Sequence, residues 1–180
     1  MQKEAGPKMT NAHSAQARNP QKAGSRQTGA KTGGNVTGAA AAQEVGSRID
    51  ERLAHAKGVL AGEAERPDAT LLVAYPYRMA TGDTLEGRLL EEIGFHCSGA
   101  EYRNWLYPQE ELKALEPDVI FCAEADEVET VKASYEYSVV AAVKNGKVTA
   151  IDFTAFQNQS LRMFEQLDEM AQFAAAAQTP

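Results

Sequence analysis

The stretch Asp118-Val-Ile-Phe-Cys122 decides the fold class of this 180-residue chain. It is short, almost entirely apolar, and follows a Glu-Pro pair that ends the helical pattern before it. A run of this length and composition is typical of a strand buried on both faces of a parallel sheet. Two further runs have the same character, Thr70–Tyr75 and Lys147–Asp152. The sequence therefore predicts three buried strands.

Helical patterns separate these strands. Helices are expected over residues 39–60, 83–93, from Pro108 to about 115, 124–135 and 157–175. Asp83 is expected to cap the second helix, with Glu86 completing a capping box, and Gly94 to end it. Strands that alternate with such helices form a parallel sheet covered on both faces. We therefore expect the α/β class: a three-layer lobe with a mostly parallel central sheet and helices on both faces.

Charge divides the chain into two parts. Residues 1–42 hold six Lys or Arg and one acid, whereas residues 43–180 hold twelve Lys or Arg and twenty-four acids. Residues 1–38 are polar and contain no aromatic residue, so we expect a disordered, basic tail. Such a tail can contact anionic lipid or nucleic acid, although a solvated tail is the simpler interpretation. The acidic remainder argues against a protein that binds nucleic acid.

No apolar run approaches the ~20 residues that span a bilayer, so no transmembrane helix is expected. Residues 1–30 contain no apolar core of a secretory signal, so no signal peptide is visible in this chain. Cys97 and Cys122 are 25 residues apart, with no CxxC motif, which argues against structural zinc. A disulfide between them and two buried free thiols both stay open.

Motifs of catalysis and phosphate binding are absent from the sequence. It contains no GxGxxG or GxxxxGK[ST] after a strand, and no GxSxG or HExxH. His13, His55 and His96 have no evident common site. We therefore expect no enzyme, no catalytic residue and no metal-ligand set.

Aromatic residues are concentrated in one segment. Six of the thirteen in the chain lie within 33 positions, namely Tyr75, Tyr77, Phe95, Tyr102, Trp105 and Tyr107. Tyr75 and Tyr77 follow the first strand, next to Arg78, at the end of the sheet where ligands bind in such folds. Aromatic rings with one Arg suit a large, flat, partly anionic ligand. Core packing is the alternative interpretation, above all for Trp105.

Four motifs carry a resemblance to a known family. They are Gly82-Asp-Thr-Leu-Glu-Gly-Arg-Leu-Leu-Glu-Glu-Ile-Gly94, Gln109-Glu-Glu-Leu-Lys-Ala-Leu-Glu-Pro-Asp-Val-Ile-Phe121, Ala141-Ala-Val-Lys-Asn-Gly-Lys-Val148 and Ile151-Asp152. In this order, residues 39–173 resemble the C-terminal lobe of the substrate-binding proteins of ABC importers for ferric siderophores, haem and vitamin B12. The resemblance divides the chain into the tail 1–38, a rigid connector helix within 39–66 and the C-terminal α/β lobe 67–180.

The resemblance implies roles for individual residues. The ligand would be an iron-siderophore, haem or a cobalamin, with no resident cofactor, and the protein would work outside the cytoplasm. Asp83 and Glu86 would dock on Arg residues of the membrane permease. The ligand-binding residues would be Tyr75, Tyr77, Arg78, Trp105, Phe153 and Phe156.

The family pattern has a second lobe that this sequence does not match. Residues 1–38 are too short and too polar to form it. The chain is therefore expected to be a truncated member, a fragment of a longer reading frame, or a half that needs an N-terminal lobe as its partner. The alternatives are a stand-alone α/β interaction module, a non-functional truncated homologue or a flavodoxin-like enzyme.

Overall fold

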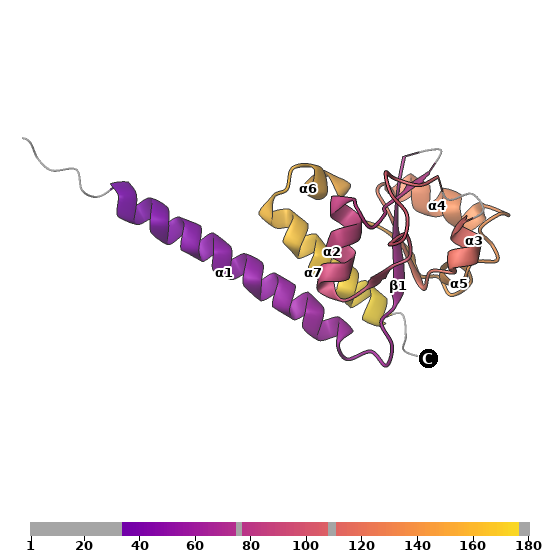
Figure 1. Ribbon diagram of the computed structural model, residues 1–180, viewed down its shortest axis with the longest axis horizontal. Coiled ribbons are helices and arrows are strands. Elements are labelled where there is room, and N and C mark those ends of the chain that lie inside the picture. Colours follow the sequence, from indigo (N-terminus) through magenta and orange to yellow (C-terminus); the bar gives the residue numbers. More distant parts are fainter. Residues whose placement is uncertain (1–33, 75–76, 108–110, 177–180) are drawn as a thin grey trace, which may run out of the picture.

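The computed structural model describes residues 34–74, 77–107 and 111–176, and only the backbone of residues 34–37. The elements, in chain order, are α1 (Gly34–Leu60), β1 (Asp68–Val73), β2 (Arg78–Met79), α2 (Leu85–Ile93), β3 (His96–Cys97), α3 (Glu111–Leu115), β4 (Val119–Cys122), α4 (Ala125–Ala133), α5 (Ala141–Lys144), β5 (Val148–Ala150), α6 (Phe153–Gln157) and α7 (Leu161–Ala176) (Figure 1). In this described part, no helix is both long and apolar enough to cross a membrane.

The sheet is mostly parallel, as predicted. Its order is β2-β1-β4-β5, and β3 also pairs with β1. β1, β4 and β5 are parallel neighbours, with Leu71 opposite Phe121 and Ile120 opposite Val148. β3 is parallel to the beginning of β1, whereas β2 is antiparallel to its end. The three predicted strands therefore lie side by side, with β5 at one edge, and two short strands share the other side of β1.

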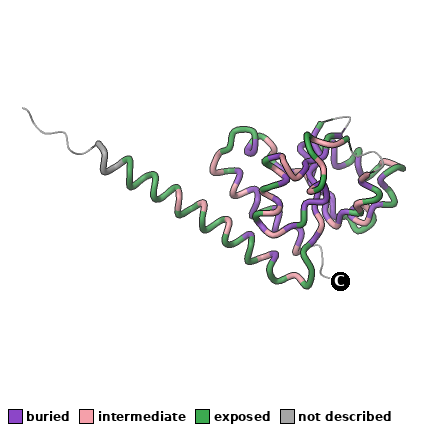
Figure 2. The backbone as a smooth tube through the Cα atoms, in the orientation of Figure 1, coloured by how far each residue is buried: buried purple, intermediate pink, exposed green. Residues whose placement is uncertain are grey.

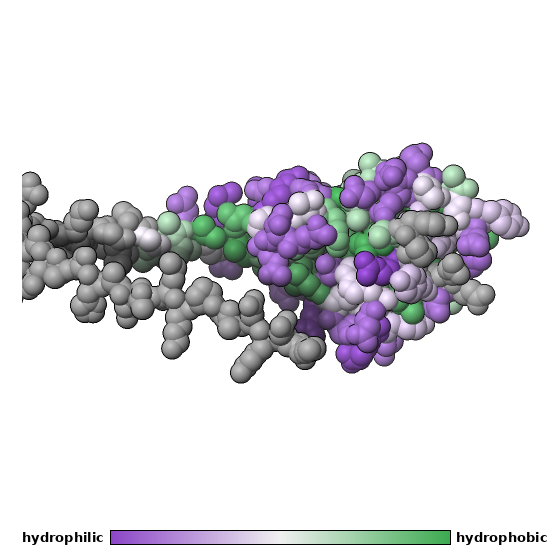
Figure 3. All heavy atoms as spheres, turned by 90° about the horizontal axis from the view of Figure 1, so that it is seen from above, coloured by the Kyte–Doolittle hydropathy of each residue, from purple (hydrophilic) through white to green (hydrophobic). Residues whose placement is uncertain are grey.

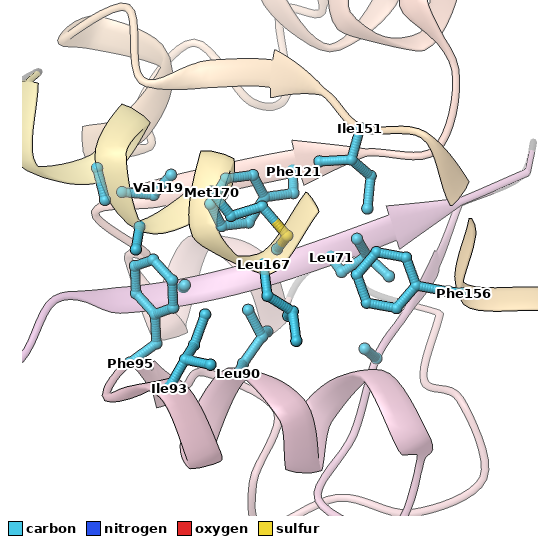
Figure 4. Packing of buried hydrophobic residues seen from close by; sticks show 14 of the residues in the cluster. Leu71, Leu90, Ile93, Phe95, Val119, Phe121, Ile151, Phe156, Leu167 and Met170 are labelled. Atoms are coloured by element: carbon cyan, nitrogen blue, oxygen red, sulfur yellow. The ribbon is translucent and has the colours of Figure 1, made fainter. Parts of the chain in front are cut away.

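Helices cover both faces of the sheet, which confirms the three-layer prediction. Leu71 and Phe121 point into a core cluster that includes residues of α1, α2, α6 and α7. Leu72 and Ile120, the alternate residues of the same strands, point into a second cluster with α3, α4 and α5. Figure 4 shows the first cluster, with Phe156 and Leu167 packed against the sheet. Cys97 and Cys122 are buried free thiols in separate clusters, which excludes the disulfide alternative.

The long helix α1 packs on the lobe through its second half only. Ala56 and Leu60 are buried, and α7 is its main neighbour. Towards the N-terminal end the residues become exposed, and Val45 is 40% exposed (Figure 2). The buried carboxylate of Asp168 on α7 accepts from Arg52 Nη1 at 3.2 Å and lies 2.5 Å from a ring nitrogen of His55. Hydrophobic packing and these polar contacts together fix the direction of α1.

Two predicted helix boundaries were wrong. Thr84, not Asp83, caps α2, because its hydroxyl accepts from the N–H of Gly87 at 3.1 Å. Glu86 therefore lies one position too early for a capping box. Gly94 ends α2 at φ +114°, as predicted. The last helix was predicted from about Gln157, but it begins at Leu161, and the residues before it form a separate short helix, α6.

Candidate functional site

The carboxyl ends of the parallel strands bring three exposed charged residues to one edge of the sheet. Arg78 lies opposite Val73, the last residue of β1. Glu124 follows β4 and Asp152 follows β5, and both are exposed. Ligands of open α/β sheets bind beyond this edge. The edge therefore is the candidate ligand site.

A loop next to this edge is held by Asp83. Its carboxylate accepts from the Thr81 hydroxyl at 2.8 Å and from the Asn104 N–H at 3.0 and 3.3 Å. The Thr81 hydroxyl also accepts from the N–H of Trp105 at 3.4 Å. These hydrogen bonds, from the Thr81 hydroxyl first and then from Asn104, hold the pKa of Asp83 below its usual value. An ionised Asp83 thus fastens the loop that carries Trp105.

This loop has a strained backbone. Asn104 and Trp105 both have positive φ, at +62° and +55°. The left-handed conformation costs about 1–2 kcal/mol for a residue with a Cβ, although Asn tolerates it better than most. Such residues persist only where their surroundings fix them, and they are concentrated at functional sites. The contacts from Thr81 and Asp83 provide that fixation here.

Arg78 and Trp105 form the most specific side-chain pair of the edge. The guanidinium carbon of Arg78 lies 5.9 Å from the centre of the Trp105 ring, within cation–π distance. The backbones beside them pair as well, since Met79 and Leu106 exchange hydrogen bonds of 2.6 and 3.2 Å. Arg78 is exposed and Trp105 is half-buried. The pair therefore presents a cation on an aromatic surface to solvent.

The predicted aromatic residues separate into two groups. Phe153 and Trp105 are partly buried and pack against the same core cluster. Phe156 is 2% exposed and stacks on Phe153, with ring centres 6.2 Å apart. Tyr77 is also buried, but in the other cluster, where its ring lies 6.1 Å from that of Tyr137. Tyr75 lies outside the described residues. Arg78, Trp105 and Phe153 are thus the predicted ligand residues with exposed surface.

The two predicted docking residues differ in environment. Asp83 is partly exposed, and its carboxylate already holds the loop described above. Glu86 is also partly exposed, and burial raises its pKa. Between them, Leu85 is 39% exposed on the first turn of α2. Both carboxylates and one apolar side chain therefore lie on the same short segment.

Sequence reasoning missed Thr81 and Asn104. Nothing in the sequence indicates that Thr81 and Asp83 would bind the backbone of a loop more than twenty residues further on. A weak signal existed at Gly82, where a Cβ atom would lie 2.1 Å from the carbonyl oxygen of Ala100. Glycine is required where two backbones approach so closely. Gly82 therefore marks the contact between the two segments.

Comparisons with known proteins show the fold. No protein-family model and no curated protein matches this chain. A possible iron-binding, periplasmic solute-binding protein from Staphylococcus epidermidis matches at 17% identity and a TM-score of 0.64, over 73% of this chain and 54% of that chain. An ABC-transporter substrate-binding protein from Listeria monocytogenes matches at 24% identity and a TM-score of 0.61, over 73% and 56%. A periplasmic haem-binding protein from Roseiflexus sp. RS-1 matches at 14% and 0.63, over 75% and 56%.

The likeness therefore is to part of a substrate-binding protein of ABC transporters. The chain spans about half the length of the solved structures that it matches. All three neighbours are described as binding proteins. At these identities the likeness concerns the fold alone, so ligand, permease and location belong to the proposal below.

Proposed function

We propose that this chain is one lobe of the substrate-binding component of an ABC importer. It contributes half of a site for a metal chelate, either an iron-siderophore, haem or a cobalamin, and releases the chelate unchanged to a membrane permease. The observation that carries the proposal is the position of Arg78 against Trp105 at the carboxyl edge of a binding-protein fold. The proposal places the protein outside the cytoplasm, where the structural neighbours described as periplasmic work.

The chemistry of the pair suits such a ligand. The Arg78 guanidinium is exposed and can donate two parallel hydrogen bonds to a carboxylate or another planar anion. Trp105, together with Phe153, offers apolar area for a flat ring system. Because the loop is fixed by Asp83, little conformational entropy is lost when a ligand settles on Trp105. No covalent step is required of any residue.

Docking and the second lobe complete the proposal. Asp83 and Glu86 would face Arg residues of the permease, and such rim charges contribute orientation more than affinity. An N-terminal lobe, as a separate chain or an additional segment, would close the site over Arg78. The exposed half of α1 supports this arrangement, since the helix extends beyond the lobe (Figure 1).

Trp105 provides a direct assay, because it is the only tryptophan in the chain. Ferric hydroxamate siderophore, haem and cobalamin are each titrated into the protein while its fluorescence is recorded. One of them should quench the emission with saturation. Arg78→Gln should weaken that ligand by about tenfold or more, since a hydrogen bond to a charged group contributes about 1.5–3 kcal/mol. Arg88→Gln, an exposed arginine on α2, is the matched control and should leave the affinity unchanged.

The outcome against the proposal is equally clear. If the folded protein leaves all three ligands unbound, the lobe has no binding function by itself. An interaction module would then be the better interpretation. If a ligand binds equally well to Arg78→Gln, the site lies elsewhere on the lobe.

A further inference from the structure

A charged residue lies at the amino end of each of three neighbouring parallel strands. Asp68 is the first residue of β1, Asp118 immediately precedes β4, and Lys147 immediately precedes β5. The N–H of Asp118 donates to the carbonyl of Asp68 at 2.8 Å, and the N–H of Ile120 donates to the carbonyl of Lys147 at 2.9 Å. The amino edge of the sheet therefore carries two carboxylates and one ammonium group on adjacent strands.

This amino edge lies at the other end of the sheet from Arg78 and Trp105. β1 runs upwards in Figure 1, away from the loop that follows α1. Figure 3, which is seen from above, therefore shows the carboxyl edge, where the surface of the lobe is mostly hydrophilic. A site at the amino edge is thus separate from the proposed chelate site and stands or falls independently of it.

A polar pocket opens at the amino edge. It has a volume of about 350 Å³ and is lined by residues 64–68, which lie between α1 and β1, together with Asp118 and Lys147. This volume lies at the lower end of the range of small-molecule sites. Arg66 is part of the lining, but its guanidinium already donates to the Glu91 carboxylate at 2.8 Å and to a backbone carbonyl at 3.2 Å. A ligand of the pocket would therefore be recognised by the two aspartates and the lysine.

The side chain of Lys147 is an unpaired cation in a buried position. The residue is 9% exposed, yet its ammonium group has no hydrogen bond and no ion pair with another described residue. In the described part of the chain, the one fully enclosed side-chain polar atom without a partner is the Thr70 hydroxyl, so the Lys147 nitrogen reaches the pocket. A buried cation without a counter-charge is unfavourable. An anionic group of a ligand would supply that counter-charge.

Each of the two aspartates keeps one carboxylate oxygen for a hydrogen-bond donor. Asp68 Oδ1 contacts a ring nitrogen of His96, and Asp118 Oδ2 accepts from the N–H of Asp68 at 2.9 Å. The other oxygen of each carboxylate has no hydrogen-bond partner among the described residues. A simple anion would be repelled by these carboxylates, whereas a simple cation would leave Lys147 unpaired. A ligand that carries both charges pairs with all three groups.

We propose that this pocket binds a small zwitterion, an α-amino acid. Its carboxylate would accept hydrogen bonds from the ammonium group of Lys147, and its own ammonium group would donate to Asp68 and Asp118. Adjacent strands lie about 4.8 Å apart, so the two charged groups of the ligand must lie close together. This spacing favours an α-amino acid over a longer zwitterion.

Thermal unfolding of the full chain, measured in the presence of each common L-amino acid in turn, tests the site. A ligand that binds only the folded protein raises the midpoint of unfolding, and at least one amino acid should do so. That amino acid is then compared by titration calorimetry with the two analogues that lack either its amino or its carboxyl group. Both analogues should bind about tenfold more weakly or worse, since each loses hydrogen bonds between charged groups.

Three results would overturn the proposal. No change of the midpoint with any amino acid would exclude the site. Equal affinity for the analogue without the amino group would leave a site for anions only. Equal affinity for the analogue without the carboxyl group would leave a site for cations only.

Lys147→Met locates the binding. The variant keeps an unbranched apolar side chain but loses the charge, so it should bind the amino acid about tenfold more weakly or worse. Without ligand it should unfold at the same or a higher temperature, because an unpaired buried cation is removed. A lower temperature would show that the ammonium group has a partner within the protein, and this would refute the proposal. Lys144→Met, at an exposed position of α5, is the matched control and should change neither quantity.

Asp118→Asn tests the acidic side of the pocket. The amide oxygen of Asn can still accept from the N–H of Asp68, but the negative charge is lost, so binding should again weaken about tenfold. Asp126→Asn, at an exposed position of α4, should leave the affinity unchanged. Full affinity in Asp118→Asn would refute the role of the carboxylates. Failure of the chelate titration with intact amino-acid binding would remove the proposed function alone, whereas the reverse result would remove the amino-acid site alone.

Discussion

Asp83 shows how one side chain can have a structural role that the sequence does not reveal. The residue was expected to cap α2, but its neighbour Thr84 does so. Its own carboxylate joins Thr81 to the backbone of Asn104. These contacts hold Trp105 in place beside Arg78. A docking role for Asp83 would thus have to be compatible with a carboxylate that already accepts three hydrogen bonds.

Asp83→Ala should release the loop and shift the emission of Trp105 to longer wavelength, because the ring becomes more hydrated. The pKa of Asp83 is lowered, chiefly by the Thr81 hydroxyl and next by Asn104. Its contribution is therefore complete above the unfolded pKa of about 3.9 and disappears as pH falls through the lower folded pKa. The unmodified protein should accordingly keep a constant Trp105 emission down to about pH 4 and change below it.

Asp126→Ala provides the control for this prediction. Asp126 is exposed in the first turn of α4, a helix whose buried apolar residues belong to the other core cluster than the one that Trp105 contacts. Its removal should leave the emission and its pH profile unchanged. An unaltered emission in Asp83→Ala would contradict the loop-holding role.

At the scale of elements, the contact between α1 and α7 depends on one buried charge. The side chain of Asp168 is 3% exposed, whereas those of Arg52 and His55 are more than half exposed. A second pair, Arg48 with Glu165, is longer, at 3.7 Å, and its arginine is exposed. Both sets of contacts therefore join α1 to α7, but the carboxylate of Asp168 is buried and that of Glu165 is partly exposed.

Asp168→Ala should lower the free energy of unfolding by about 1–3 kcal/mol, because hydrogen bonds to a buried carboxylate are lost. The loss is smaller than for most broken buried pairs, since Arg52 and His55 remain accessible to water. Arg48→Ala removes an exposed ion pair and should cost less than about 1 kcal/mol. Urea unfolding followed by circular dichroism measures both. Equal effects of the two variants would contradict the importance of burial.

The elements that could be predicted are those with a strong local pattern. β4 is a continuous apolar run and β1 a mostly apolar one, and Gly94 ends α2 because glycine readily adopts positive φ. The two residues of β2 have no such pattern, and their pairing with the end of β1 is a tertiary contact. The start of α7 was predicted four residues too early, and the short helix α6 was not predicted, because Asn158 and Gln159 end α6 without a Gly or Pro.

The candidate site was predictable in its position but only partly in its members. The carboxyl edge follows from the strand order, and this places Arg78 correctly next to β1. Burial could not be read from the loop sequence, so Tyr77 and Phe156 were expected beside the ligand although they are core residues. Tyr77 lies two residues before Met79 of β2, and both side chains belong to the second core cluster, where the ring of Tyr77 lies beside that of Tyr137. Their contact with a ligand stays a prediction.

At the scale of the whole molecule, the described chain consists of a packed lobe and a helix that belongs to it only in part. Leu60 and Ala56 are in the core of the lobe, whereas Val45 is exposed. The predicted division of the chain into a connector at 39–66 and a lobe from residue 67 therefore separates residues that pack together. The folding unit should instead include the second half of α1.

Two shortened chains test this unit. A chain that begins at Ser47 should keep its free energy of unfolding within about 0.5 kcal/mol, because residues 38–45 of α1 are exposed and Gly46 is only partly buried. A chain that begins at Ala61 loses the buried Leu60, whose side chain alone contributes about 1.5–3 kcal/mol, and uncovers the apolar face of α7. It should unfold at much lower urea and bind a hydrophobic dye. If both shortened chains are as stable as the full chain, no part of α1 belongs to the folding unit. If both are destabilised, the exposed half of α1 also contributes to the stability of the lobe.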